Sequence, residues 1–278
     1  MRVVRTIAEV RAARRSLGRL GFVPTMGALH AGHMSLVALA AQRSDTVAVS
    51  IFVNPTQFAP HEDLDRYPRP IEADLAQLEK AGVDLVFLPA AEEIYPTGFA
   101  TRIEVGSIAD RLEGAIRPNH FSGVATVVVK LLNIITPDLA FFGQKDVQQT
   151  RVVRQVVRDL NMPVEIVIGP TVREPDGLAL SSRNIYLDTA QRQEALSLFQ
   201  GLRAAQTVFL SGERDAEKLR ALAAAPIQET HGKIDYVSVA DPDTLVELDM
   251  IGPVGAILSL AVRFGATRLL DNVMLGAD

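Results

Sequence analysis

The chain of 278 residues contains no cysteine. This absence excludes disulfide bonds and thiol catalysis, and it is compatible with a reducing compartment. It also weakens the case for a zinc site, because zinc without thiolates needs several histidine or carboxylate ligands. His30 and His33 lie near each other, but His61, His120 and His231 are isolated in the sequence. We therefore predict that the side chains of this protein form no metal site.

Long apolar runs are also absent. A transmembrane helix needs about 20 consecutive apolar residues, and the best candidate, residues 124–135, is shorter and contains Lys130 and Asn133. The N-terminus is rich in arginine, as transit peptides are, but it lacks the apolar core and the cleavage site of a secretory signal. The spacing of Ile7 and Val10 predicts a surface helix there instead. We expect a cytoplasmic protein without a membrane partner.

Basic residues are not in excess: 33 acidic and 28 basic side chains give a net charge of −5. Proteins built to hold nucleic acid usually show a basic face, so we predict no nucleic-acid partner and disfavour a tRNA synthetase. No G-x-G-x-x-G string follows the first predicted strand, which disfavours a redox enzyme that binds a dinucleotide. The 48% hydrophobic and 22% charged residues are typical of an ordinary globular protein.

Strands and helices are predicted to alternate through residues 20–170. This alternation indicates an α/β fold with a Rossmann-like parallel sheet. Pro24 and Gly27 are predicted to end the first strand. The predicted strands are residues 21–23, 46–53, 84–88, 101–105, 139–142 and 164–168, and the predicted helices begin near residues 33, 71, 124 and 147.

The pattern changes after Pro175, Asp176 and Gly177, which form a turn signal. Helices are predicted at 190–210 and 216–225, followed by strands at 234–240 and 255–262, and residues 268–274 complete the unit. We therefore predict two domains: residues 1–174, with the parallel sheet, and residues 175–278, a smaller α+β domain.

The first strand, turn and helix carry two histidines at the helix start. Unpaired N–H groups and the helix dipole suit an anion there, and Gly32 would let a ligand approach the backbone. His30 and His33, three residues apart, could face one bound group. The alternatives are exposed histidines or two ligands of a metal. Because strand, turn, glycine and helix start coincide, we favour a phosphate site.

Other polar segments also follow predicted strands, where ligands collect in parallel sheets. Asn54 and Gln57 follow one strand, and residues 143–146 follow another. In that second segment Lys145 offers a mobile charge, although Asp146 could simply cap a helix. Residues 180–184 offer two hydroxyls and a guanidinium, which suit a triphosphate but could equally form a helix cap.

The sequence resembles a known family at these same positions. His30-Ala31-Gly32-His33 resembles the HxGH signature of the nucleotidyltransferase superfamily, which is related to class I aminoacyl-tRNA synthetases. Together with residues 23–27, 52–58, 143–146 and 180–184, it resembles the pantoate–β-alanine ligase family. Leu180 stands where that family usually has methionine, and leucine keeps an apolar side chain of similar size.

The resemblance implies an ATP-dependent ligase that joins (R)-pantoate to β-alanine through a pantoyl adenylate, with Mg²⁺ on the phosphates. His30, His33 and Lys145 would be catalytic, and Asn54, Gln57 and Gln149 would bind pantoate and β-alanine. The implied ATP-binding residues are Met26, Gly27, Ala28, Leu29, His30, Ala31, Gly32, His33, Gly143, Gln144, Lys145, Asp146, Val172, Leu180, Ser181, Ser182 and Arg183.

The resemblance also implies a homodimer, and it puts Tyr67, Arg117 and His120 in loops that would close over the site. The main alternative is another HxGH adenylyl or cytidylyl transferase, which would share the histidines but should lack the paired glutamines. An alternative from a different class is a non-enzymatic nucleotide sensor. The acceptor that makes pyrophosphate appear from ATP would distinguish these functions.

Overall fold

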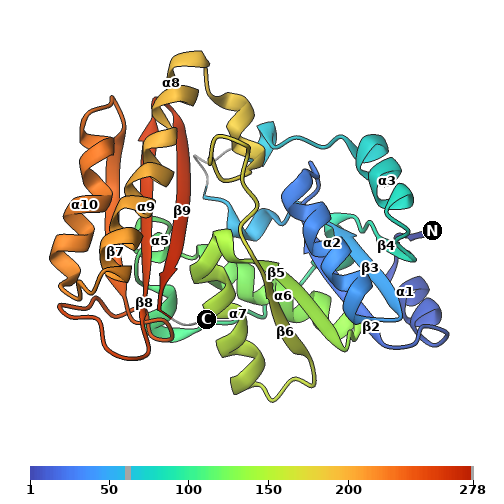
Figure 1. Cartoon of the computed structure of the whole chain (residues 1–278). Coiled ribbons are helices and arrows are strands. Elements are labelled where there is room, and N and C mark those ends of the chain that lie inside the picture. Colours follow the sequence, from blue (N-terminus) through green and yellow to red (C-terminus); the bar gives the residue numbers. More distant parts are fainter. Residues whose placement is uncertain (60–63, 277–278) are drawn as a thin grey trace. The chain divides into compact units, whose positions relative to one another are not determined.

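The computed structural model describes residues 1–59 and 64–276 (Figure 1). Contacts divide the chain into two compact units. Unit 1 comprises Met1–Gln144 and Gln148–Pro170, and unit 2 comprises Lys145–Val147 and Thr171–Asp278. Lys145 therefore belongs to unit 2, although the chain on either side of this short segment belongs to unit 1. The predicted domain boundary at residue 174 stays a prediction, and His61 lies outside the described residues.

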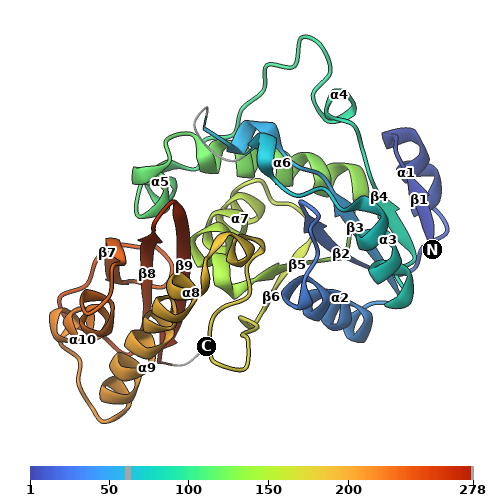
Figure 2. The same ribbon diagram turned by 90° about the horizontal axis from the view of Figure 1, so that it is seen from above.

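Unit 1 is built on a parallel sheet of six strands in the order β1-β4-β3-β2-β5-β6. The α2 and α3 helices contribute to one apolar core with the sheet, and Figure 2 shows α6 on the opposite side from α2. The strands are β1 Arg2–Val4, β2 Leu20–Thr25, β3 Thr46–Ile51, β4 Leu85–Phe87, β5 Leu139–Gly143 and β6 Glu165–Gly169. The helices are α1 Ile7–Arg14, α2 Ala31–Arg43, α3 Ile71–Lys80, α4 Ala91–Ile94, α5 Glu113–Ile116, α6 His120–Ile135 and α7 Val147–Asp159. The predicted α/β class is confirmed.

The strand order reverses between β2 and β5. From β2 the chain adds β3 and β4 on one side, and it then returns to place β5 and β6 on the other. In open parallel sheets the carboxyl ends of the strands at such a reversal form the usual ligand crevice. His30 follows β2, and Gly143 ends β5. The topology thus brings two of the segments predicted to bind phosphate to one position.

Unit 2 contains an antiparallel sheet of three strands: β7 Lys233–Ala240, β8 Ala256–Phe264 and β9 Thr267–Leu275. Its helices are α8 Thr189–Glu194, α9 Leu196–Leu210 and α10 Ala216–Gln228. Alternate residues of β8, including Leu258, Leu260 and Val262, belong to a core shared with α9 and α10. A Cβ at Gly201 would lie 2.1 Å from the Ala223 carbonyl oxygen, so α9 needs glycine to approach α10. The predicted α+β character of this region is confirmed.

Several details of the predicted elements were wrong. Pro24 does not end the first strand: it lies within β2, in register with Ser50. Its missing N–H is tolerated because β5 pairs with β2 only at Gly21 and Phe22. The predicted strand at 101–105 is irregular chain. The Ile103 amide donates to the Thr126 hydroxyl rather than to the main chain of a neighbouring strand.

Two further details concern the lengths of helices. The helix predicted at 190–210 is divided at Ala195, which ends α8 and begins α9. The helix predicted to stop at residue 225 continues through Pro226 to Gln228. The α6 helix also begins at His120, before the predicted start at 124, and β1 was not predicted at all. No helix of the described chain is long and apolar enough to cross a membrane.

Candidate active site

We call residues 26–33, between β2 and the start of α2, the HxGH turn. Gly27 and Ala28 have positive φ angles, +83° and +51°, so the chain bends sharply just before the helix. The amides of Ala28 and Leu29 donate to the carboxylate of Asp74 on α3. The turn is therefore held by hydrogen bonds to a distant part of the chain. It presents the start of α2 at the carboxyl end of β2.

The two histidines of the turn cap α2 through the same ring nitrogen. His30 Nδ1 accepts from the Gly32 amide at 3.1 Å, and His33 Nδ1 accepts from the His30 amide at 3.3 Å. A nitrogen that accepts carries no proton, so in each neutral imidazole the proton lies on Nε2. The ring centroids are 4.1 Å apart. Two Nε2–H donors thus lie beside the positive end of the helix dipole, which suits an anionic oxygen.

Gln57 lies beside this turn with its amide oriented by Asn54. Asn54 is 1% exposed, and its Nδ2 donates to Gln57 Oε1 at 3.0 Å and to the Gly123 carbonyl at 3.2 Å. Its Oδ1 accepts from the Tyr95 hydroxyl at 2.8 Å. Gln57 Nε2 then donates to the Met26 sulfur at 3.1 Å, and a thioether is a weak acceptor. The amide is thus held with its N–H groups directed to the HxGH turn.

His120 and Arg117 hold the main chain of the same segment. His120 Nδ1 lies 2.9 Å from the Gln57 carbonyl oxygen, and Arg117 Nη1 lies 3.1 Å from His120 Nε2. Tyr67 is 5% exposed and packs edge-on against Phe58, with ring centroids 6.1 Å apart. The structure therefore gives these three predicted loop residues packing and hydrogen-bonding roles around residues 57 and 58.

The two adjacent glutamines of α7 differ in their surroundings. Gln148 is 3% exposed and clamps a neighbouring loop: its Oε1 accepts from the Glu113 amide, and its Nε2 donates to the carbonyls of Ile108 and Arg111. Gln149 is half-buried, and no hydrogen bond joins its side chain to the described residues. Of the two, Gln149 has the amide available to a ligand.

Lys145 in unit 2 is fixed through its backbone. Its carbonyl oxygen accepts from Asn272 Nδ2 at 2.8 Å, and its Nζ lies 3.5 Å from Asp146 Oδ1. The neighbouring Asp271 is 3% exposed and forms two bonds with Arg173, of 2.6 and 2.9 Å. Burial raises the pKa of the Asp271 carboxyl, and the Arg173 guanidinium acts in the opposite direction. Lys145 is thus held against a charged part of β9.

The serine loop of the same unit forms a helix cap, the alternative that its sequence left open. Ser181 Oγ accepts from the Arg183 amide at 3.3 Å and begins a short 3₁₀ helix, Ser182–Tyr186. The cap uses the oxygen as an acceptor and leaves the hydroxyl proton as a donor. A cavity of about 10 Å³ is lined by Ser181, Asn184, Lys145 and Asp271, among others. The lysine and the serine loop, distant in sequence, therefore lie close together within unit 2.

Val172 lies in a hairpin near this loop. Its carbonyl oxygen accepts from the Leu180 amide at 3.0 Å, and Arg173 pairs with Ala179 across a hairpin. The predicted turn at its tip is present, with Gly177 at φ +102°. The main chain at Val172 is thus part of the hairpin that precedes the serine loop.

A family model described as pantoate-beta-alanine ligase matches residues 2–274. The chain belongs to the pantoate–β-alanine ligase family. It is 61% identical to the pantothenate synthetase of Chloroflexus aggregans, over 99% of this chain and 100% of that protein. The predicted enzyme class, a ligase that forms an amide bond, is confirmed, and another HxGH transferase is not favoured.

Solved structures of pantoate–β-alanine ligases have the same fold. The pantothenate synthetase of Thermus thermophilus superposes with a TM-score of 0.94 at 47% identity, covering 100% of both chains. A ligase from Francisella tularensis, solved with β-γ ATP and β-alanine, gives 0.82 at 37% identity, covering 100% of this chain and 99% of that one.

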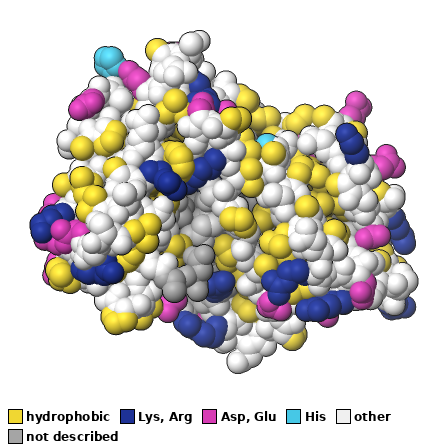
Figure 3. Space-filling model, in the orientation of Figure 1, with side chains coloured by type: hydrophobic (Ala, Val, Ile, Leu, Met, Phe, Trp, Pro, Cys, Tyr) yellow, Lys and Arg dark blue, Asp and Glu magenta, His cyan; other side chains and the backbone are white. Residues whose placement is uncertain are grey.

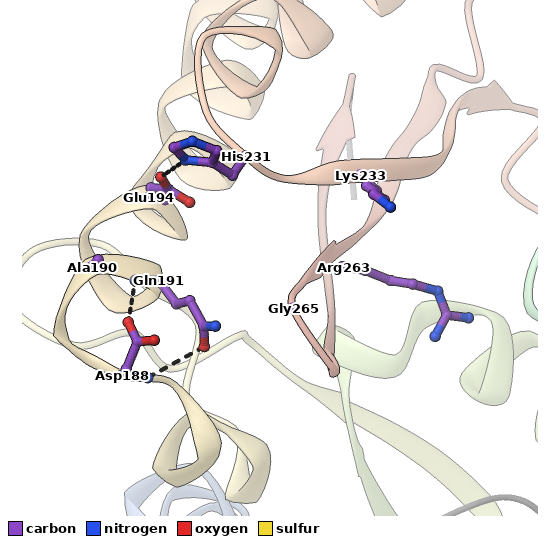
Figure 4. Close-up of a pocket in the computed structure, with 8 residues that line it drawn as sticks. All are labelled: Asp188, Ala190, Gln191, Glu194, His231, Lys233, Arg263 and Gly265. Carbon is purple, nitrogen blue, oxygen red and sulfur yellow. Dashed lines mark hydrogen bonds and ion pairs between the residues drawn. The ribbon is translucent and has the colours of Figure 1, made fainter.

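Two surface features of this pantoate–β-alanine ligase family member lie apart from the residues discussed above. A pocket of about 380 Å³ in unit 2 lies between α8, β7 and β8 (Figure 4). Glu194 there raises the pKa of His231 by a hydrogen bond of 2.6 Å. None of the predicted site residues lines this pocket. On the face drawn in Figure 3, basic side chains occur in several separate groups, some of them beside acidic ones, rather than as one basic patch.

Proposed function

We propose that this chain condenses (R)-pantoate with β-alanine to form pantothenate, through a pantoyl adenylate, with release of AMP and pyrophosphate. The observation that carries the proposal is the HxGH turn at the strand-order reversal, where His30 and His33 each keep the proton on Nε2. Two preorganised donors at a helix N-terminus suit negative charge that develops on phosphoryl oxygens. The family of the chain supplies the substrate class.

In the first step a pantoate carboxylate oxygen attacks the α-phosphorus of ATP. A bond forms between that oxygen and phosphorus, the bond to the β-phosphate breaks, and pyrophosphate leaves. We assign His30, His33 and Lys145 to the phosphoryl oxygens, and Ser181, Ser182 and Arg183 to the departing pyrophosphate. The main chain of Val172 contacts adenine.

In the second step the β-alanine amine attacks the acyl carbon of the adenylate. The new C–N bond replaces the C–O bond to AMP, and the nitrogen releases a proton to solvent. Gln57 and Gln149 hold the hydroxyl and carboxylate groups of pantoate, and neutral amides do so without neutralising the nucleophile. Asn54, whose polar atoms bind protein groups, acts on pantoate by orienting Gln57.

Mg²⁺ would reach this site as the partner of the ATP phosphates. Within residues 1–59 and 64–276, no three histidine, aspartate or glutamate side chains gather as a metal site. Phosphate oxygens and water suit Mg²⁺, which keeps much of its hydration shell. We further propose a cytoplasmic homodimer, with the domain division at residue 174, and analytical ultracentrifugation would test the dimer.

The order of these steps can be tested by omitting substrates. With ATP, Mg²⁺ and pantoate alone, we expect about one equivalent of pyrophosphate per active site, because the adenylate stays bound. AMP should appear only when β-alanine is added. Quench-flow measurement of pyrophosphate and AMP checks both expectations. Steady AMP formation from ATP and β-alanine without pantoate would contradict the proposed order.

Replacing Gln57 or Gln149 with alanine should weaken the use of pantoate and leave ATP binding nearly unchanged. A buried polar group left without its partner costs about 1–3 kcal/mol, so we expect the KM for pantoate to rise by roughly tenfold to a hundredfold. Steady-state kinetics and calorimetry with ATP measure the two effects. Gln155→Ala is the matched control, because Gln155 lies on α7 and its side chain bonds Asp159 and Arg158. Lost ATP affinity with an unchanged pantoate KM would place these glutamines at the nucleotide instead.

A further inference from the structure

Asp74 is a buried carboxylate that binds two consecutive amides of the HxGH turn. It lies on α3 and is 1% exposed. Its Oδ2 accepts from the Ala28 amide at 2.9 Å, and its Oδ1 accepts from the Leu29 amide at 2.8 Å. Both oxygens are therefore directed at the turn.

No cation pairs with this carboxylate among the described residues. Burying a charge without a counter-ion is unfavourable, and only hydrogen bonds from the protein can compensate it. Bonds from N–H groups to an ionised carboxylate are shorter and stronger than neutral ones. The structure therefore concentrates an unusually strong pair of contacts on Ala28 and Leu29.

The turn needs such contacts because its backbone is unfavourable. Ala28 has φ +51°, in the left-handed region that costs a residue with a Cβ about 1–2 kcal/mol. Gly27 precedes it at φ +83°, and a Cβ there would lie 3.0 Å from Asp74 Oδ2. The carboxylate thus fits closely against one left-handed residue and binds the amide of the next.

The conformation of Ala28 and Leu29 determines where His30 begins α2. His30 is the N-cap residue, and its amide in turn holds the His33 ring. We propose that Asp74 is a positioning residue that fixes the Nε2–H groups of His30 and His33 for the developing charge in the transition state. This inference rests on the proposed function, because it assumes that the two histidines act on ATP phosphates.

The test compares Asp74→Asn with Asp84→Asn. Asparagine at 74 removes the charge and turns an N–H group toward a backbone amide, so the turn loses at least one of its two bonds. A displacement of the histidines by about 1 Å can cost about a hundredfold in rate, and we expect kcat to fall by roughly tenfold to a hundredfold. The KM for pantoate should stay within about twofold of that of the wild type, since Gln57 is held by other contacts.

Asp84 is the control because its carboxylate also accepts from a backbone amide, but it is an exposed residue at the opposite end of the sheet. Its Oδ2 accepts from the Val47 amide at 2.8 Å, just before β4. Asp84→Asn should keep kcat within about twofold of that of the wild type. Thermal melting of both variants gives the effect on stability separately.

A second variant covers the case in which Asp74→Asn folds poorly. Glycine reaches positive φ without the cost that alanine has. In the double variant Asp74→Asn, Ala28→Gly the turn therefore depends less on the carboxylate, and kcat should recover by about threefold or more. A simple loss of stability at α3 would give no such recovery.

The outcomes separate this inference from the proposed function. If the wild type forms pyrophosphate from ATP and pantoate, but Asp74→Asn matches Asp84→Asn in kcat, the positioning role is overturned. The absence of recovery in the double variant would overturn it as well. If the wild type itself forms no pyrophosphate, the proposed function fails instead.

Discussion

Replacing His33 with alanine is expected to lower kcat by about two orders of magnitude or more, while the KM for ATP changes little. Loss of one preorganised donor to a developing oxyanion typically has an effect of this size. Lys145→Ala should behave in the same way, because an ammonium group also stabilises charge that grows in the transition state. If only the KM for ATP rises, the two groups act in ground-state binding.

His33 has a structural contact as well, so two further variants separate its roles. Its Nδ1 accepts from the His30 amide, and alanine would remove that cap bond together with the Nε2 donor. Asparagine can place an acceptor near the Nδ1 position but has no donor at Nε2. We expect His33→Asn to melt near the wild-type temperature and to be as slow as His33→Ala. Glutamine, which can place a donor near Nε2, should recover part of kcat.

The sequence was sufficient for the parts of the site that depend on local patterns. Apolar runs followed by glycine, histidine or lysine placed His30 and Gly143 at strand ends, and parallel strands then brought these ends together. The choice of reaction came from the family resemblance. Composition alone would have left several nucleotide-binding functions open.

The contacts that hold these groups in place could not be predicted. Asp74 lies 45 residues after Leu29 in the sequence, and nothing local marks it as more than a first-turn acidic residue of α3. The family resemblance predicted Asn54 as a substrate ligand, and the structure adds that its amide binds protein groups and orients Gln57. Such roles depend on which segments pack together, which periodicity does not report.

The incorrect elements have the same cause. Residues 101–105 alternate like an edge strand, but the Ile103 amide finds a side-chain acceptor in Thr126 on α6. The division of the predicted helix at Ala195 has no glycine or proline to mark it. Pro226 is a residue that usually ends a helix, and yet α10 continues through it. Tertiary packing overrides local propensity at each of these positions.

Asp271→Ala is expected to destabilise unit 2 by about 3–5 kcal/mol, because it leaves the guanidinium of Arg173 largely buried without its partner. The Arg173 side chain is 17% exposed, and its two nitrogens bind both carboxylate oxygens of Asp271. The matched control is Glu217→Ala, since Glu217 pairs with Arg220 but is 82% exposed. Such surface pairs contribute about 1 kcal/mol or less. Urea unfolding followed by circular dichroism compares the two free energies of unfolding.

The double variant Arg173→Met, Asp271→Leu distinguishes a lost pair from an unpaired charge. Replacing both members of a buried pair by apolar residues of similar volume is often neutral, so we expect most of the stability to return. We expect kcat of this double variant to be lower than that of the wild type. Asp271 lines a cavity with Lys145 and Ser181, and it precedes Asn272, whose side chain binds the Lys145 carbonyl. If Asp271→Ala lowers the free energy of unfolding by no more than Glu217→Ala does, the buried pair contributes no more to stability than the exposed pair. If the double variant has the wild-type kcat, the position of Lys145 does not depend on the Arg173–Asp271 pair.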